Sequence, residues 1–363
     1  MARAHRLTEV QRIPTSGARA VEAFTIDGTH YLAIPQLSYD QKSSPGGMNG
    51  GNSNTDVLLL KWDGTRYVED SVLPGVGGED AEFFTIDDRK FLAIASIRMG
   101  SGPYNFEVGS PIYEWKDGTF EPFQTVLGYA AKEWRHFTID GVHYLGLAQN
   151  RPGPKSVSSV ILRWNGERFE EFQEIPSRGG YNLYAFEIDG TTYLAHADHS
   201  LPSKLYRWEN GSFVEHQDLA EAGARAFLRL EDADGIYLAI ASMHADSLLL
   251  KWDGAQFAPH QVLEGGTAGR EFQLVEAGGS TFVVRPSFVR GPLTGPTTTL
   301  ESPIYRFVDG RLELDDEFDT TGACDATLVH SEDGEPVVAV TNALSADVTF
   351  ASETVLYRFS AAS

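Results

Sequence analysis

Two groups of polar residues in this sequence have the types and spacing that could do chemistry. The first group, Asp80, Glu133, Asn182 and Asp325, recurs at the same point of a repeated pattern, just before a strand-like phrase. Carboxylate and amide oxygens are the ligands that Ca²⁺ prefers. If the four residues meet at one level of the fold, we expect them to hold Ca²⁺ or another divalent cation. The alternative is a hydrated channel without a cofactor, in which the carboxylates pair with Arg135 and Arg270.

The alignment that defines this group gives two polar columns, both predicted to face a central channel because side chains alternate along a strand. The first column contains Ala20, Asp80, Glu133, Asn182, Ala226, Ala268 and Asp325. The second column, two residues further on, contains Glu22, Glu82, Arg135, Tyr184, Leu228, Arg270 and Thr327. The mostly apolar column between them is expected to pack between neighbouring repeats.

Histidines form the second group. The segment Tyr193-Leu-Ala-His196-Ala-Asp198-His199 has a histidine where other repeats have an aliphatic residue, and the model of the fold developed below brings His136 and His244 to the same sector. Histidine with aspartate can act as a general acid/base pair or bind a transition metal. The alternative is that these are unrelated surface histidines.

The roles of these residues depend on whether the chain is an enzyme, which the sequence leaves open. If it is, the predicted catalytic residues are Glu133, Arg135, Tyr184, His136, His196 and Asp198. The residues predicted to bind a ligand are Glu22, Glu82, Asn182, Arg270, His199 and His244. No Gly-x-Ser-x-Gly, phosphate-loop or His-Glu-x-x-His motif in a matching context specifies a reaction.

The elements that must position these residues come from a repeat. One phrase, Phe24-Thr-Ile-Asp-Gly-Thr-His-Tyr-Leu-Ala, returns at Phe84, Phe137 and Phe186, with weaker copies later. Two β-rich runs joined by a short Asp/Gly turn are typical of a hairpin, which we call strands A and B. A second phrase of the type Leu60-Lys-Trp-Asp-Gly predicts strand C and its turn. Strand D then begins with an aromatic residue, which is followed by Gln four residues later.

Seven copies of strands A to C are present, but only six copies of strand D follow them. The missing copy is residues 7–13 at the N-terminus. The sequence therefore predicts an all-β, seven-bladed propeller whose ring is closed when the N-terminal strand completes the C-terminal blade. The predicted blades of this single domain are 15–74, 75–127, 128–176, 177–220, 221–263, 264–319, and 320–363 with 1–14.

The repeat resembles a known family. The pattern Phe-x-Ile-x-x-x-x-Tyr-Leu, then Ser-x-x-Tyr-x-Trp as in Ser110–Trp115 and Ser203–Trp208, then Phe-x-x-x-Gln, is similar to the EPTP or epilepsy-associated repeat. The resemblance covers nearly the whole chain and implies a seven-bladed propeller. Animal members of that family are extracellular modules that recognise receptor ectodomains, so the resemblance implies an interaction role.

Charge and composition exclude some partners. The net charge is −22, from 51 acidic and 29 basic side chains, which disfavours nucleic acid and an anionic membrane surface. Cys324 is the only cysteine, so no disulfide forms within the chain. With no apolar leader at the N-terminus we expect a cytoplasmic location, although a secreted protein given without its leader would look the same.

The expected site lies on one face of the ring. The D-to-A and B-to-C connections of a propeller share a face, and here the B-to-C connections 37–55, 97–109, 288–301 and 343–352 are long. Variable loops on a repeated scaffold commonly carry function. We therefore predict that a small molecule or a protein binds at this loop-rich face and the channel mouth. The rival hypothesis is an enzyme that uses the same mouth on a small molecule.

Overall fold

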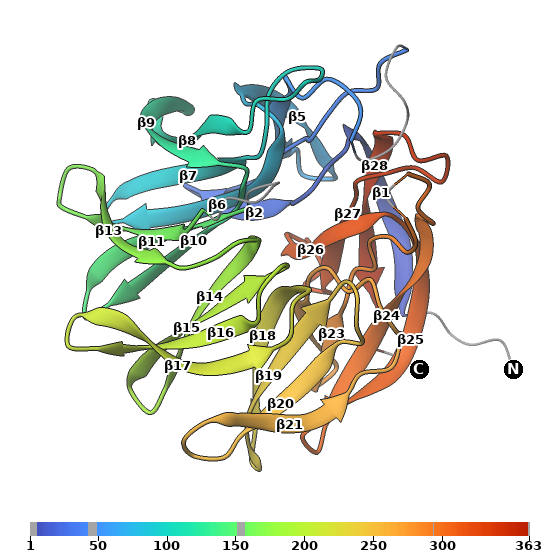
Figure 1. Ribbon diagram of the computed structural model, residues 1–363. Coiled ribbons are helices and arrows are strands. Elements are labelled where there is room, and N and C mark those ends of the chain that lie inside the picture. The colour runs from blue at the N-terminus through green and yellow to red at the C-terminus, as the bar shows by residue number, and fades with distance from the viewer. Residues whose placement is uncertain (1–5, 43–48, 151–156, 293, 362–363) are drawn as a thin grey trace, which may run out of the picture.

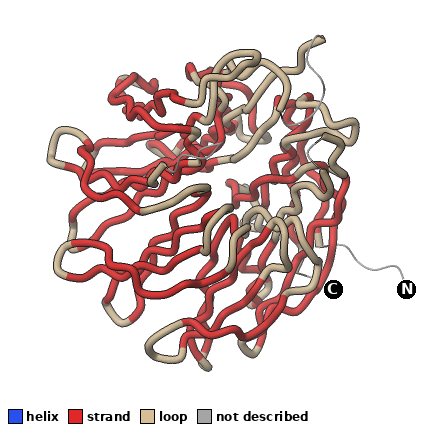
Figure 2. Tube along the Cα trace, in the orientation of Figure 1, coloured by secondary structure: helices blue, strands red, loops and turns tan. Residues whose placement is uncertain are grey.

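This computed structural model describes residues 6–42, 49–150, 157–292 and 294–361, and alternating apolar and polar residues form strands throughout these ranges. Across these ranges the secondary structure consists of 28 strands, turns and loops (Figure 2). No helix among the described residues could cross a membrane.

The strands form seven antiparallel sheets of four strands each, one per blade. From the inside outward, blades 1 and 2 contain β2 Glu22–Ile26, β3 Thr29–Ile34, β4 Asp56–Trp62 and β5 Tyr67–Pro74, then β6 Gly78–Ile86, β7 Arg89–Ser96, β8 Glu107–Lys116 and β9 Thr119–Tyr129. Blades 3 and 4 contain β10 Ala131–Ile139, β11 Val142–Gln149, β12 Ser159–Trp164 and β13 Phe169–Ile175, then β14 Gly180–Ile188, β15 Thr191–Asp198, β16 Ser203–Glu209 and β17 Ser212–Ala220.

Blades 5 and 6 contain β18 Ala224–Asp232, β19 Gly235–Ser242, β20 Leu248–Trp252 and β21 Phe257–Val262, then β22 Gln273–Ala277, β23 Ser280–Val284, β24 Thr299–Val308 and β25 Arg311–Thr321. Blade 7 contains β26 Ala323–Val329, β27 Val337–Asn342, β28 Ala351–Phe359 and, as its outer strand, β1 Leu7–Ser16. The inner strands surround the centre of the ring, and strands such as β13, β17 and β21 lie at its rim (Figure 1).

The N-terminal strand pairs with the last strand of the chain. β1 runs antiparallel to β28, from Leu7 opposite Phe359 to Ser16 opposite Ala351. The predicted all-β, seven-bladed propeller is therefore confirmed, and the pairing joins the first blade to the last. It removes two open sheet edges that would otherwise expose unpaired backbone groups.

The Asp-Gly turn of the repeated phrase has the left-handed backbone that a tight hairpin needs. Asp27 and Gly28 have φ values of 50° and 81°, and the same pair recurs at Asp140 and Gly141. Two consecutive residues with positive φ define the turn that matches strand twist, and Asp and Gly tolerate it best. This turn sets the register of strands A and B and so fixes which side chains face the channel.

The glutamine of strand D joins each blade to the next. Gln173 of β13 donates its Nε2–H to the carbonyl oxygen of Phe213 in β17 at 2.7 Å, and its Oε1 accepts from the Phe213 N–H at 2.9 Å. Gln124 makes the same pair with Phe169. Gln11 of the N-terminal strand makes it with Tyr67 of blade 1. The Phe-x-x-x-Gln pattern therefore places a backbone-pairing amide between outer strands.

Replacing Gln173 with Ala should lower the free energy of unfolding by about 1–3 kcal/mol, because it leaves a peptide N–H and a carbonyl of Phe213 without their partner. Denaturant unfolding monitored by circular dichroism measures the change. The exposed neighbour Glu174, changed to Ala, is the matched control and should alter stability by less than about 0.5 kcal/mol. Equal losses in the two variants would contradict the proposed role of the amide.

Aromatic residues of the repeats pack blade against blade. One buried cluster joins Phe84 of blade 2 to Trp134 and Phe169 of blade 3, and the Trp134 side chain is fully buried. Equivalent clusters lie at the other blade boundaries. These aromatic layers hold the inner strands rigidly around the channel.

Candidate functional site

A one-residue bulge marks the point where the chain enters the channel, within the inner strand in five blades and just before it in blades 1 and 6. The register between β6 and β7 shifts between Gly78 and Asp80, so Glu79 is the extra residue. Equivalent shifts occur in blades 3, 4, 5 and 7. A bulge re-aims side chains locally, so neighbouring residues such as Glu79 and Asp80 both line the channel.

As a result, three levels of side chains surround the channel instead of two. The bulge ring, nearest the loop-rich face, contains Arg19, Glu79, Lys132, Tyr181, Arg225, Arg270 and Cys324. The second level contains Ala20, Asp80, Glu133, Asn182, Ala226, Glu271 and Asp325. The third contains Glu22, Glu82, Arg135, Tyr184, Leu228, Gln273 and Thr327.

Two cavities meet at the bulge ring. The lower cavity, of about 290 Å³, lies within the channel between the three levels of side chains. The upper cavity, of about 650 Å³, is surrounded by the B-to-C loops of the loop-rich face. Arg19, Glu79, Lys132, Tyr181 and Arg270 line both cavities, so the bulge ring is the floor of the upper cavity and the roof of the lower one.

The carboxylates of the lower cavity bind the backbone of the next blade. Asp80 accepts the N–H of Trp134 at 2.8 Å, Glu133 accepts that of Leu183 at 2.8 Å, and Asp325 accepts that of Val21 at 2.8 Å. Glu22 and Glu82 of the third level do the same for Phe83 and His136. The inner strand of a blade has no neighbour on its channel side, so these carboxylates satisfy N–H groups that would otherwise be unpaired.

Burial and crowding of like charges raise the pKa values of these carboxyl groups. Desolvation, helped by the nearby Glu82, raises the pKa of Asp80 to about 7. Desolvation and Asp325 raise the pKa of Glu271 to about 8. Desolvation also raises the pKa of Glu133 well above its usual range, although Arg135 opposes it with an Nη2–Oε1 distance of 2.9 Å. The lower cavity therefore takes up protons near neutral pH.

The predicted cation ligands Asp80, Glu133, Asn182 and Asp325 do line one cavity, but in different blades. Among the described ranges no three His, Cys, Asp or Glu side chains converge closely enough to hold a metal ion. Asn182 donates its Nδ2–H to Glu133 at 2.8 Å, so one predicted ligand binds another. Of the pairs expected in the alternative, Glu133 with Arg135 is present, and the divalent cation stays a prediction.

In blade 6 the predicted alignment was wrong by three residues. Gln273 pairs with Val284, whereas Gly269 pairs with Ser287 in an isolated bridge. The register shifts by one residue between these two pairs, which places a bulge at Arg270. Glu271 therefore occupies the level assigned to Ala268, and Gln273 the level assigned to Arg270. Alignment on the glycine failed because Ala268 takes its position in blade 6: the Ala268 carbonyl accepts the N–H of Phe288 as the Gly77 carbonyl accepts that of Ile97.

The predicted histidine group separates into three places. The Nε2 of His136 lies 2.9 Å from the Nδ1 of His143, a residue of the opposite-face turn, so the prediction that His136 joins the others was wrong. His196 is buried and lies 3.0 Å from the Ser159 hydroxyl of blade 3. Only His199 and His244 come together, with ring centroids 4.9 Å apart, at the upper cavity.

Asp198 organises a loop. Its carboxylate accepts backbone N–H groups of Arg178, Gly179, Ser200 and Leu201 at 2.7–3.2 Å, and it is 1% exposed. The carboxylate therefore fixes the B-to-C loop of blade 4 in place. A carboxylate with all its lone pairs used in this way is poorly placed to accept a proton from a substrate.

The floor of the upper cavity carries a surplus of positive charge. Arg19, Lys132, Arg225 and Arg270 are each 6–8% exposed, whereas Glu79 is the one carboxylate among the seven residues of the bulge ring. Glu79 Oε1 lies 3.1 Å from Lys132 Nζ, and its Oε2 lies 3.7 Å from Arg270 Nη2. Arg19 Nε is 4.0 Å from Glu79. Three cations thus share one carboxylate.

The walls of the upper cavity are largely apolar. Leu37, Ile97, Phe106, Met243 and Phe288 come from the B-to-C loops of blades 1, 2, 5 and 6. The described parts of the long loops pack together in a buried cluster that also includes Leu344 and Phe350 of blade 7. The predicted wall of long loops is therefore present in the described part of the chain. Residues 43–48 of the blade 1 loop lie outside the described residues.

The sequence contained a signal for the bulge ring that strict alternation concealed. The column one residue before Asp80 was assigned no role, yet six of its seven members are polar: Arg19, Glu79, Lys132, Tyr181, Arg225 and Thr267. Polar residues at a position facing the next blade would be buried without partners. A polar column adjacent to another polar column indicates a bulge. Arg19, Glu79, Lys132, Tyr181 and Arg225 could have been identified in this way.

This geometry defines a closed propeller with a charged channel and a loop-walled cavity. The sequence model of the EPTP domain matches residues 6–63, 119–165 and 168–209. These residues of the chain are therefore EPTP repeats, as the resemblance implied. Each matched stretch begins at strand D of one blade and ends at strand C of the next, which is why the N-terminal strand is needed to complete the last blade.

Two curated relatives are thrombospondin-type laminin G domain and EAR repeat-containing proteins. The human protein is 29% identical over 104 residues, 28% of this chain and 15% of its own length. The mouse protein is 30% identical over 120 residues, 32% of this chain and 16% of its own length. The match thus spans about a sixth of these relatives. A crystal structure of BBS1N in complex with ARL6DN, soaked with mercury, has a TM-score of 0.61 at 13% identity and 98% coverage of both chains, which supports the fold alone.

Proposed function

We propose that this propeller is a binding protein that receives a ligand, or a side chain of a protein partner, in the upper cavity of its loop-rich face. The observation that carries the proposal is the cavity of about 650 Å³, with loop-built apolar walls above a floor of buried charged groups. Concave sites with mostly apolar walls and a few convergent polar groups are typical of ligand binding. The EPTP repeats support an interaction role.

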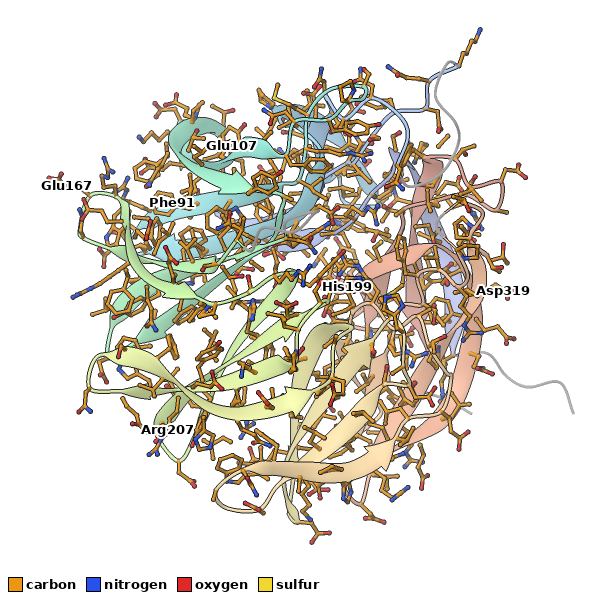
Figure 3. All side chains as sticks on the ribbon, in the orientation of Figure 1. Phe91, Glu107, Glu167, His199, Arg207 and Asp319 are labelled. Atoms are coloured by element: carbon orange, nitrogen blue, oxygen red, sulfur yellow. The ribbon has the colours of Figure 1, made fainter. Side chains whose placement is uncertain are left out.

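The test blocks the cavity with a bulky covalent label on one introduced cysteine, and compares each variant before and after labelling. His244 is exposed at the mouth, so His244→Cys provides a handle for a bulky maleimide, while Cys324 is buried at 1% exposure. The control handle is Glu167→Cys, in an exposed turn at the outer rim of the ring, far from His199 (Figure 3). A chemically diverse fragment library is screened by ligand-observed NMR before and after labelling.

We expect labelling at position 244, and not at position 167, to abolish binding of most fragments that bind the wild-type protein. The reason is that the cavity of about 650 Å³ at the mouth combines apolar walls with buried polar groups. If fragments bind equally well to both labelled proteins, their site lies elsewhere and the proposal is wrong.

A further inference from the structure

The positive charges on the floor of the upper cavity are only partly balanced by Glu79. Arg225 is 6% exposed, and no carboxylate of the described chain lies within ion-pair distance of it. Its Nη1 lies 2.9 Å from His199 Nδ1, a neutral acceptor, and its guanidinium stacks on Tyr181 at 3.6 Å from the ring centroid. A buried cation that makes only neutral contacts pays a desolvation penalty that an anion would offset.

Two further groups add to the surplus. Arg19 Nε is buried and has no hydrogen-bond partner among the residues that the structure describes. Arg98 lines the same cavity and is 5% exposed, with bonds to the neutral oxygens of Ser53, Ser38 and Gly50. Five buried cations therefore face one carboxylate, Glu79, in a chain whose net charge is −22. The overall composition favours the opposite sign, so this concentration is local to the cavity.

The electrostatic environment of neighbouring groups agrees with this charge. Arg225, Lys132 and Arg270 lower the pKa of the Tyr181 phenol to about 8 against the opposing effect of burial. Burial, with Arg270 nearby, lowers the pKa of Arg225 to about 10. Burial together with Arg225 lowers the pKa of His199 to about 4, so this imidazole is neutral and leaves the positive potential to the guanidinium groups.

We propose that the upper cavity binds an organic oxyanion, with its carboxylate or phosphate on Arg225, Arg19 and Lys132 and its apolar body against the loop wall. This inference rests on the proposed function and names its ligand chemistry. Arginine and lysine are the residues that recognise carboxylate and phosphate, and the guanidinium of Arg225 is already oriented by its stacking on Tyr181. The walls of Phe106, Phe288 and Met243 match an aromatic or aliphatic body and reject a small hydrated ion.

The test uses phenyl phosphate and phenylacetate as anionic probes and benzylamine as the cationic control, with isothermal titration calorimetry and thermal unfolding on the full chain. We expect one or both anions to bind and to raise Tm by about 3 °C at a concentration of about 100 times Kd. Benzylamine should do neither. Inorganic phosphate should bind at least tenfold more weakly than phenyl phosphate because it cannot use the apolar wall.

Variants of Arg225 test the residue that orients the anion. Arg225→Gln should weaken the binding of phenyl phosphate at least tenfold, and Arg225→Lys should recover part of it because it keeps the charge without the planar guanidinium. The matched control is Arg207→Gln, at the periphery of the ring (Figure 3), which should leave binding unchanged. If Arg225→Gln fails to fold, the comparison of anionic and cationic probes on the wild-type protein still decides.

The sources of the anion are distinguished by a five-residue peptide with phosphotyrosine at its centre. If the natural ligand is a free small molecule, the residues flanking the phosphotyrosine should weaken binding relative to phenyl phosphate. If it is an anionic side chain of a protein partner, they should strengthen binding. Binding of benzylamine, or of none of the anions, would overturn the proposal. If in that case maleimide at position 244 still abolishes fragment binding, the cavity is a binding site for another chemistry and only the anion is wrong.

Discussion

Removing residues 1–14 is expected to lower the free energy of unfolding by more than about 4 kcal/mol, the largest effect anticipated for this chain. The deletion removes most of β1 and its pairing with β28, and the Gln11 amide that pairs with the backbone of Tyr67. It also removes Arg6, which binds Asp315 at 2.6 Å. Two sheet edges would then be exposed, so we also expect association between truncated molecules.

Thermal unfolding and size-exclusion chromatography measure both effects. Deleting residues 1–5 alone, which leaves β1 intact, is the control and should preserve Tm within about 1 °C. A synthetic peptide of residues 6–16, added to the truncated protein, should restore Tm by re-forming the outer strand of blade 7. A truncated protein with unchanged Tm would show that the pairing of β1 with β28 does not hold the ring together.

The second large effect is a dependence of stability on pH that originates in the lower cavity. The pKa of Asp80 rises from its usual value to about 7 and that of Glu271 to about 8 on folding, mainly because both groups are desolvated. The folded protein therefore binds more protons than the unfolded chain between about pH 4 and 8. Since a raised carboxyl pKa stabilises the fold at low pH, this contribution is lost as pH rises through that range.

Asp80→Asn removes one of these titrating groups while keeping an oxygen that can accept the N–H of Trp134. Relative to the wild-type protein, we expect the variant to gain about 2 kcal/mol of stability between pH 5 and pH 8. Urea unfolding at several pH values measures the difference. Glu167→Gln, in an exposed turn, is the control and should show no such change. A constant difference between Asp80→Asn and wild type across this range would contradict a proton held at Asp80.

The architecture was predictable because each repeat contains the residues that define its own turn, its packing and its contact with the next blade. The Ile-Asp-Gly turn sets a hairpin, the aromatic residues pack between blades, and the glutamine of strand D binds the next blade, so one pattern repeated along the chain defines a ring. The missing copy of strand D predicted the pairing of β1 with β28. These are local signals, and tertiary structure reinforces them.

The site was less predictable because it depends on exceptions to the pattern. Strict alternation placed Asp80 and Glu133 correctly toward the channel, but it missed the bulge that adds Glu79 and Lys132 beside them. In blade 6 Ala268 occupies the position that glycine holds in most other blades, which displaced the alignment, so that Glu271 was overlooked. The sequence therefore predicted an acidic channel mouth, whereas the bulge ring makes the floor of the upper cavity cationic.

The predicted catalytic residues show the same limit. Glu133 and Arg135 line the lower cavity, beneath the bulge ring, whereas His196 is buried beside Ser159 of the neighbouring blade and Asp198 fixes a loop. Chemistry that requires these groups to act on one substrate needs them in one place. The described geometry separates them, and their catalytic roles stay predictions of the sequence alone.

Crystals soaked with 4-bromophenyl phosphate would test the account most directly, because the anomalous signal of bromine locates the ligand without assumptions. We predict bromine in the upper cavity near Phe288 and the phosphate within hydrogen-bond distance of Arg225. A fully occupied ligand at any other surface, with the floor of Arg19, Lys132 and Arg225 left without an anion, would contradict the assignment of this cavity as the binding site.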